Sequence, residues 1–156
     1  MNMKSKDLMF PSTGRRHTYK EMTDMQKISN RENMSIDELY RYRTECGELQ
    51  CHRINLPEGI AGELIMNVPG KEKTLSIEEV FVDRKFRNTG LGTKLLDFAE
   101  NTGRTLGFQK VEVRPFSTDP LVPDNKLQEW YKKRGYAPVG EKMCKRINTK
   151  IFKVIL

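Results

Sequence analysis

The sequence predicts a single mixed α/β domain, of the α+β kind, over residues 1–156. The length suits one hydrophobic core, and 37% hydrophobic with 31% charged residues is typical of a globular chain. Three strand-like runs joined by short turns favour a mostly antiparallel sheet. Two helical segments alternate with later strands, which predicts helices packed on that sheet.

The N-terminal part is expected to begin irregularly and then to form a helix. Residues 1–33 are polar and rich in methionine, with weak periodicity, which indicates an irregular or strand-like lead-in. A helix is expected over residues 35–46. Ser35 can cap it, Glu38 stands where a capping box needs an acid, and Gly47 can end it.

Three strands are predicted in the middle of the chain. They are Leu49–Leu56, Ile60–Val68 and Thr74–Val82. The turn signals Pro57-Glu58-Gly59 and Pro69-Gly70-Lys71 separate them. Connections this short favour an antiparallel meander.

Helices and strands alternate in the second half. Apolar residues at helical spacing predict a helix from Leu91 to Gly103 or beyond. Residues 108–113 predict a strand, and the tail over 145–156 has strand character. Residues 124–134 predict a helix, with Gly135 at its end and, on one side, Leu127, Trp130 and Tyr131.

Composition narrows the classes of protein. No apolar run approaches the roughly 18 residues of a membrane span, and the N-terminus has no apolar stretch of signal-peptide length. Cys46, Cys51 and Cys144 are too few to staple a fold and suit a reducing compartment. Together with His17 and His52 they make no convincing zinc spacing, so no metal is expected. We therefore expect a soluble, cytoplasmic protein without a membrane partner.

Basic residues gather near the C-terminus. Residues 132–156 hold eight lysines and arginines against one acid, Glu141, a surplus equal to the net charge of +7 of the whole chain. Such a cluster fits an anionic partner, either nucleic acid or a phosphorylated cofactor. A solvated basic face without a partner is the equal alternative.

A glycine pair between a strand and a helix is the most informative segment. Gly90 and Gly92 allow positive φ and let a ligand approach the main chain. The N–H groups that open the helix can hold a phosphate, with Arg87 and Thr93 as further donors. A dinucleotide-binding fingerprint would need glycine where Leu95 stands. A plain turn and helix start is the alternative.

The segment resembles the cofactor motif of the GNAT acetyltransferases, Gln/Arg-x-x-Gly-x-Gly/Ala after a strand that ends in Val-Asp. This chain has Val82-Asp83 and then Arg87-Asn88-Thr89-Gly90-Leu91-Gly92. Residues 110–114 look like the next sheet strand of the family. Residues 130–136 look like its closing Tyr-x-x-x-Gly-aromatic motif. The resemblance covers about residues 76–140.

The resemblance implies an N-acetyltransferase that moves an acetyl group from acetyl-CoA, its co-substrate, to an amine by direct attack. It implies a three-layer fold with helices on both faces of a central sheet that is splayed between two strands. The loop amides would hold the pyrophosphate, and the preceding strand would hold the pantetheine arm. The cofactor-binding residues so implied are Phe81, Val82, Arg87, Asn88, Thr89, Gly90, Leu91, Gly92 and Thr93.

One departure from the family concerns the start of the last helix. Many members have an asparagine eleven residues before the closing glycine, where this chain has Asp124 and then Asn125. We carry the cofactor role to Asn125. The segment 115–123 is longer than the usual connection of the family. It would lie beside the slot where the splayed sheet lets the two substrates meet, and would serve there as a specificity element.

Proton transfer requires a base and an acid, because an amine of pKa about 10.4 must lose its proton before it attacks. Glu112 lies in the Glu-Val-Arg pattern that carries the proposed base in some N-terminal amine acetyltransferases. Glu79 or Glu78, or ordered water, is the alternative. Period two would put Glu78 and Glu79 on opposite sheet faces. Tyr131, four residues before Gly135, matches the tyrosine with which the family protonates the CoA thiolate.

Three functions are compatible with the sequence. The first is acetylation of an amine of a small molecule or protein. The second acts on an amine linked to nucleic acid, such as aminoacyl-tRNA, as some GNAT toxins do. The third is a non-catalytic acyl-CoA-binding module, against which the intact glycines and Tyr131 argue. Acceptor loops vary on a common scaffold, so the acceptor, the acyl chain length and a homodimer are left open.

Overall fold

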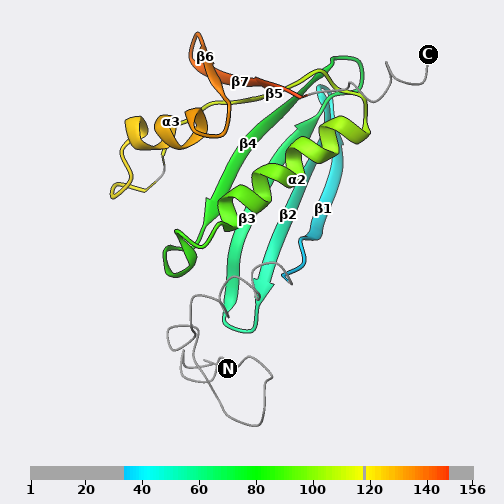
Figure 1. Cartoon of the computed structure of the whole chain (residues 1–156). Coiled ribbons are helices and arrows are strands. Elements are labelled where there is room, and N and C mark those ends of the chain that lie inside the picture. The colour runs from blue at the N-terminus through cyan, green and yellow to red at the C-terminus, as the bar shows by residue number, and fades with distance from the viewer. Residues whose placement is uncertain (1–33, 118, 148–156) are drawn as a thin grey trace, which may run out of the picture.

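A computed structural model describes residues 34–117 and 119–147, so the predicted lead-in over 1–33 and the end of the predicted tail lie outside the described residues. The described chain forms a mixed α/β fold, as predicted (Figure 1). Neither described α-helix is long and apolar enough to cross a membrane. The elements are β1 (Asp37–Thr44), β2 (Gly47–Leu56), β3 (Gly59–Val68), β4 (Thr74–Val82), the 3₁₀ turn η3 (Arg84–Phe86), α2 (Leu91–Thr105), β5 (Lys110–Val113), α3 (Asp124–Lys132), β6 (Ala137–Val139) and β7 (Lys142–Arg146).

The described strands form one sheet of seven, in the order β1-β2-β3-β4-β5-β7-β6. Strands β1 to β4 follow the chain order and pair antiparallel, which confirms the predicted meander. The three strands predicted in the middle of the chain correspond to β2, β3 and β4. Strand β5 pairs parallel with β4 and antiparallel with β7, so the sheet is mixed.

The predicted helix over residues 35–46 is wrong, because this segment forms β1 and the turn after it. The Ser35 hydroxyl bonds to the Asp37 carboxylate at 3.4 Å instead of capping a helix. Gly47 begins β2: its φ is 139°, and a Cβ there would lie 2.4 Å from the carbonyl oxygen of Val68. The glycine thus serves a close approach between strands. Pairing of the aromatic, β-prone segment with β2 outweighs the local capping signal.

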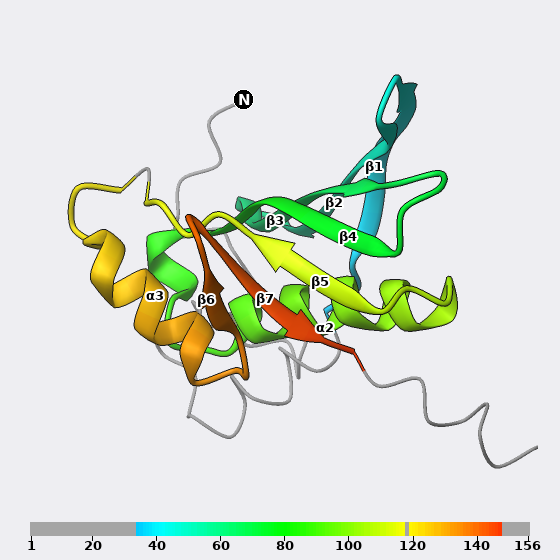
Figure 2. The same ribbon diagram turned by 90° about the horizontal axis from the view of Figure 1, so that it is seen from above.

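Helix α2 confirms the helix predicted from Leu91 and extends to Thr105. It lies along one face of the sheet and contacts β3, β4 and β5 (Figures 1 and 2). Its apolar side is at most 1% exposed, which shows that the predicted periodicity faces the core. The residues of this interface include Leu91, Leu95, Leu96 and Ala99 from α2, and Leu64, Met66, Leu75 and Val111 from the strands.

Strands β4 and β5 separate towards their carboxyl ends. Their parallel pairing runs from Thr74 and Lys110 to Ile77 and Val113. Beyond this point β4 continues to Val82 beside β3, while the chain after β5 leaves towards α3 (Figure 2). The sheet is therefore splayed between these two strands, as the resemblance implied.

The C-terminal elements differ in their limits from the prediction. Helix α3 ends at Lys132, two residues earlier than expected. Strand β6 was not predicted, and β7 begins at Lys142, three residues before the expected tail strand. The two short strands form a hairpin that completes the sheet beside β5.

Candidate functional site

The glycine loop and the first turn of α2 follow the splayed part of β4, after the 3₁₀ turn η3. Gly90 caps the helix in the left-handed region, with φ of 83°, and Asn88 also has a positive φ, of 61°. No described side chain caps α2, and its first turn contains no acidic residue. The N–H groups of this turn have the geometry and polarity for an anion, because the helix dipole favours negative charge there. The left-handed positions explain the need for glycine or asparagine.

Gly92 brings α2 close to α3. A Cβ on residue 92 would lie 3.0 Å from Cζ2 of Trp130 and 3.7 Å from Cγ2 of Val82. Trp130 packs at the periphery of the core, and Arg134 lies over its indole ring at 3.8 Å. Arg134 also donates to the Thr93 hydroxyl through Nε at 3.0 Å and Nη2 at 2.8 Å. Helix α3 and the residue Arg134 after it are therefore held against the first turn of α2.

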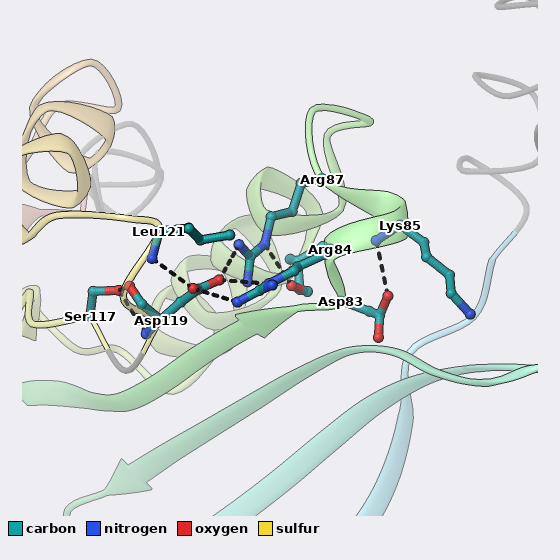
Figure 3. Close-up of polar contacts among 8 residues, drawn as sticks. Asp83, Arg84, Lys85, Arg87, Ser117, Asp119 and Leu121 are labelled. Atoms are coloured by element: carbon teal, nitrogen blue, oxygen red, sulfur yellow. Dashed lines mark hydrogen bonds and ion pairs between the residues drawn. The ribbon is translucent and has the colours of Figure 1, made fainter.

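The Arg87 side chain is already engaged within the protein. Its Nε donates to the Val82 carbonyl at 3.0 Å, and its Nη1 lies 2.6 Å from the Asp119 carboxylate (Figure 3). Arg84 forms a second, two-pronged contact with Asp119, at 3.2 and 2.8 Å. The Leu121 N–H, together with the guanidinium groups of Arg87 and Arg84, holds the pKa of the Asp119 carboxyl far below its ordinary value. Sequence reasoning did not find this contact, because no spacing rule pairs residues so far apart.

The backbone of β4 presents two residues to the splayed side. The Asp83 N–H donates to the Ala61 carbonyl on β3, at 2.9 Å. Because peptide groups alternate along a strand, those of Phe81 also face β3, whereas those of Val80 and Val82 face the slot. The Val82 carbonyl accepts from Arg87. Of the two positions predicted for the pantetheine arm, Val82 has the slot-facing peptide, and Phe81 contributes a side chain that is 37% exposed.

A β-bulge in β4 corrects the expectation that Glu78 and Glu79 lie on opposite faces. Ile77 pairs with Met66, and Glu79 pairs with Ile65, so the register shifts by one residue between them. Ile77 and Val80 both pack on the core, which leaves both intervening glutamates exposed on the face away from α2. The Ser76 hydroxyl donates to Glu78 at 3.2 Å. Both carboxylates therefore lie where β4 leaves β5.

Glu112 lies on β5 opposite Ser76, within the paired part of the two strands. Its carboxylate accepts from Lys142 Nζ at 3.0 Å, and its side chain is 21% exposed. The residue is thus near the splay but held in an ion pair. Among the described residues, Glu79 has no such partner.

Tyr131 is buried on α3, with 3% exposure. Its ring meets those of Trp130 and Tyr136 edge to face, at 4.9 and 5.4 Å between centroids. Burial raises the pKa of the Tyr131 phenol well above its ordinary value, so the group stays protonated at neutral pH. Tyr136 donates to the buried carboxylate of Glu100 at 3.1 Å, and Lys145 Nζ lies 2.7 Å from the same carboxylate. The ring of Tyr131 is therefore held in place by the rings of Trp130 and Tyr136, and Tyr136 is itself fixed by Glu100.

The structure also places Asn125 and two lysines of the basic C-terminal cluster. Asn125 is exposed on the first turn of α3, and no described contact joins it to the glycine loop. Lys142 and Lys145 pair with Glu112 and Glu100, so part of the C-terminal basic charge is neutralised internally. Within 34–117 and 119–147, no group of three histidine, cysteine or acidic side chains is placed to share a metal ion.

One comparison with known proteins gives the family of this chain. The sequence matches the family model of the Acetyltransferase (GNAT) family over residues 19–136. No curated protein matches it significantly. Similar solved structures include AtaTR bound with AcCoA, at 17% identity, TM-score 0.56 and coverage of 78% of this chain and 97% of that one.

Two further structures are alike in fold. Nourseothricin acetyltransferase has 15% identity and a TM-score of 0.50, with coverage of 64% of this chain and 66% of that one. Ard1 from Thermoplasma volcanium has 16% identity and a TM-score of 0.51, with coverage of 63% and 70%. The match thus spans just under two thirds of the nourseothricin enzyme. At such identities these structures support the fold.

Proposed function

Because this chain belongs to the GNAT acetyltransferase family, we propose that it transfers an acetyl group from acetyl-CoA to an amine of a small molecule or protein. One observation carries the proposal: a helix N-terminus that no described side chain caps follows the splayed end of β4, after one 3₁₀ turn and the glycine loop. A thioester arm that enters between β4 and β5 would thus have its phosphates at one end and the exposed carboxylates of the bulge near the other. AtaTR, which is similar in fold and is bound with AcCoA in its solved structure, supports the co-substrate.

We assign the phosphate end of the site to the loop. The amides of residues 88–93 would donate to the pyrophosphate, since Asn88 and Gly90 already have the left-handed geometry that turns successive N–H groups outward. The slot-facing peptides of Val80 and Val82 would border the pantetheine arm. Arg87 would support the loop through its contacts with Val82 and Asp119, and Thr93 would do so through its contact with Arg134. Both side chains would also make the surroundings of the phosphates more polar.

A carboxylate of the slot would remove the proton of the amine. Deprotonation of an alkylamine of pKa about 10.4 at pH 7 costs about 4.6 kcal/mol, which a base in contact with the amine reduces. Glu79 is the stronger candidate, because it is exposed at the splay and no described residue pairs with it. Glu112 would first have to give up its contact with Lys142. Ordered water held by either carboxylate is the remaining route.

Tyr131 would protonate the departing thiolate. Its phenol is kept neutral by burial, and its position on α3 is fixed by Trp130 and Tyr136. A neutral phenol in a site of low dielectric can donate to a sulfur as negative charge develops there. Acetyl-CoA supplies the activated acetyl group, and side chains of this protein would orient the reactants and move the protons.

The test compares two glycines that share a left-handed conformation. Gly90 has φ of 83°, and Gly107, at the other end of α2, has φ of 79° with open space around a Cβ. Gly90→Asp and Gly107→Asp should cost similar backbone strain, but only the first adds a negative charge beside the phosphates. Calorimetry with acetyl-CoA should show binding to the wild type and to Gly107→Asp and its loss in Gly90→Asp. Equal affinity of the two variants would remove the loop from the site.

The acceptor class is tested by turnover. We expect the wild type to acetylate members of a panel of small amines and peptides, with radioactive acetyl-CoA as donor. Tight binding of acetyl-CoA without transfer to any fraction of protein, RNA or small molecules would instead favour a binding module.

A further inference from the structure

We propose that Asp119 is a positioning residue of the acetyl-CoA site, which fastens the segment after β5 to the loop after β4 and so sets the opening of the slot. This inference rests on the proposed function. Asp119 belongs to the segment 115–123 that the sequence suggested as a specificity element. The proposed role of Asp119 is different, because it would shape the site of the acetyl donor.

Three residues contact the Asp119 carboxylate. Arg84 meets it through Nε and Nη2, Arg87 through Nη1 at 2.6 Å, and the Leu121 N–H donates to Oδ1 at 2.9 Å (Figure 3). The Asp119 side chain is only 13% exposed, and that of Arg87 is 30% exposed. The contact with Arg87 is thus partly shielded from water, whereas the Arg84 side chain is 61% exposed. Charge-assisted contacts with planar guanidinium groups fix direction as well as distance.

These contacts join the two sides of the splay. The pairing of β4 with β5 ends at Ile77 and Val113. Arg84 and Arg87 follow the end of β4, whereas Asp119 lies six residues beyond the end of β5. Arg87 also holds the last carbonyl of β4, that of Val82. A single guanidinium thus connects the edge of one strand to the segment that follows the other.

The contact also reaches the helix that carries the proposed acid. Ser117 Oγ donates to the Asp119 carbonyl at 3.0 Å, and the Ser117 N–H donates to Asp124 Oδ1 at 2.7 Å. Asp124 begins α3, on which Tyr131 lies. The chain of contacts runs from Arg87 through Asp119 and Ser117 to Asp124. It would keep the glycine loop and the proposed acid, Tyr131, in a fixed position relative to each other.

A competing role predicts the opposite sign. If Asp119 merely occupied the arginines in place of the diphosphate, its removal would raise the positive charge of the loop and tighten acetyl-CoA binding. Two features favour positioning. The Leu121 N–H would lose its acceptor if the carboxylate left, and Arg87 is turned towards Val82 by its Nε. The arginines are thus arranged around Asp119.

The experiment measures acetyl-CoA affinity by calorimetry in wild type, Asp119→Asn, Asp119→Glu and Glu129→Gln. The last removes an equal charge from an exposed pair with Lys132 on α3. We expect Asp119→Asn to weaken binding about 5- to 150-fold, the range over which one site of a protein typically changes the affinity of another, and Asp119→Glu to recover part of it. Glu129→Gln should bind like the wild type. The loss should persist at high salt, where a purely electrostatic effect is screened.

A double-mutant cycle separates positioning from general destabilisation. Arg87→Gln should weaken binding, and adding Asp119→Asn to it should cost much less than it does in the wild type. The thermal midpoint of each variant shows that the protein is folded during the titration. Tighter binding by Asp119→Asn, unchanged binding, or full additivity with Arg87→Gln would each overturn the inference. Failure of the wild type to bind acetyl-CoA would instead refute the proposed function itself.

Discussion

The indole ring of Trp130 lies so close to Gly92 that a Cβ on residue 92 would approach Cζ2 to 3.0 Å. The last glycine of the cofactor motif therefore serves the packing of α3 on α2, in addition to any approach of a ligand. This contact places the helix of Tyr131 beside the glycine loop. It also means that substitutions of Gly92 combine two effects.

Gly92→Ala should destabilise the protein by about 1–3 kcal/mol, because the indole has to move to accommodate the methyl group. Urea unfolding measures this cost. In a Trp130→Leu background the same change should cost clearly less, since the smaller side chain leaves room. Equal costs in both backgrounds would show that the indole does not restrict residue 92.

Tyr131→Phe should reduce kcat by about 10²-fold and leave acetyl-CoA affinity nearly unchanged, because the ring packing is kept while the proton donor is lost. Tyr136→Phe is the matched control. It removes a hydroxyl bonded to buried Glu100 and should destabilise the fold by about 1–3 kcal/mol. Its kcat should fall much less. Similar kcat values for Tyr131→Phe and the wild type would assign the acid to water.

Glu79→Gln should lower kcat/KM with a good amine acceptor by about 10²-fold if this carboxylate is the base, since its exposed position at the splay allows contact with the amine. Glu78→Gln changes the neighbouring carboxylate of the same bulge and should have a smaller effect. Glu112→Gln breaks the pair with Lys142 and tests the rival assignment. A larger loss for Glu112→Gln than for Glu79→Gln would reverse our preference.

Acid should weaken the fold through Asp119. The folded-state pKa of its carboxyl is depressed below the unfolded value of about 3.9, so its contribution is present above that value and is lost as pH falls towards the folded pKa. Urea unfolding should show wild type more stable than Asp119→Asn at pH 7, with the difference shrinking below about pH 4. Glu129→Gln, in an exposed pair, should track the wild type throughout. A difference that is independent of pH would contradict this role.

The basic residues separate the two acceptor hypotheses. Lys110, Lys133 and Arg146 are exposed, whereas Lys142 and Lys145 are paired with glutamates and would leave uncompensated carboxylates if replaced. The triple substitution of the exposed residues by serine should leave turnover on a small amine or peptide almost unchanged. Filter binding should show weak affinity for tRNA at about 150 mM salt. Submicromolar affinity that the variant loses, with a salt slope of about 0.7 per contact, would favour an acceptor carried on RNA.

Local patterns in the sequence were sufficient for most elements. Strand-like runs divided by Pro-Gly turn signals predicted β2, β3 and β4, and the apolar spacing from Leu91 predicted α2. The spacing of Gly90 and Gly92 after Val82-Asp83 indicated the family, which the match over residues 19–136 confirms. Such signals are reliable because turns, helix periodicity and left-handed glycines depend on a few adjacent residues.

Other features depended on contacts between distant parts of the chain. The capping pattern at Ser35 was overruled because residues 37–44 pair with β2, and the bulge that puts Glu78 and Glu79 on one face follows from the register with β3. The contacts of Asp119 with Arg84 and Arg87 span thirty or more residues, as do those of Arg134 with Thr93 and of Lys142 with Glu112. The sequence alone thus determined the elements and the loop motif, whereas the tertiary structure decided which charges meet. The physical reason is that an ion pair forms only where the packing of strands and helices brings two distant side chains together. Local periodicity in the sequence carries no information about this packing.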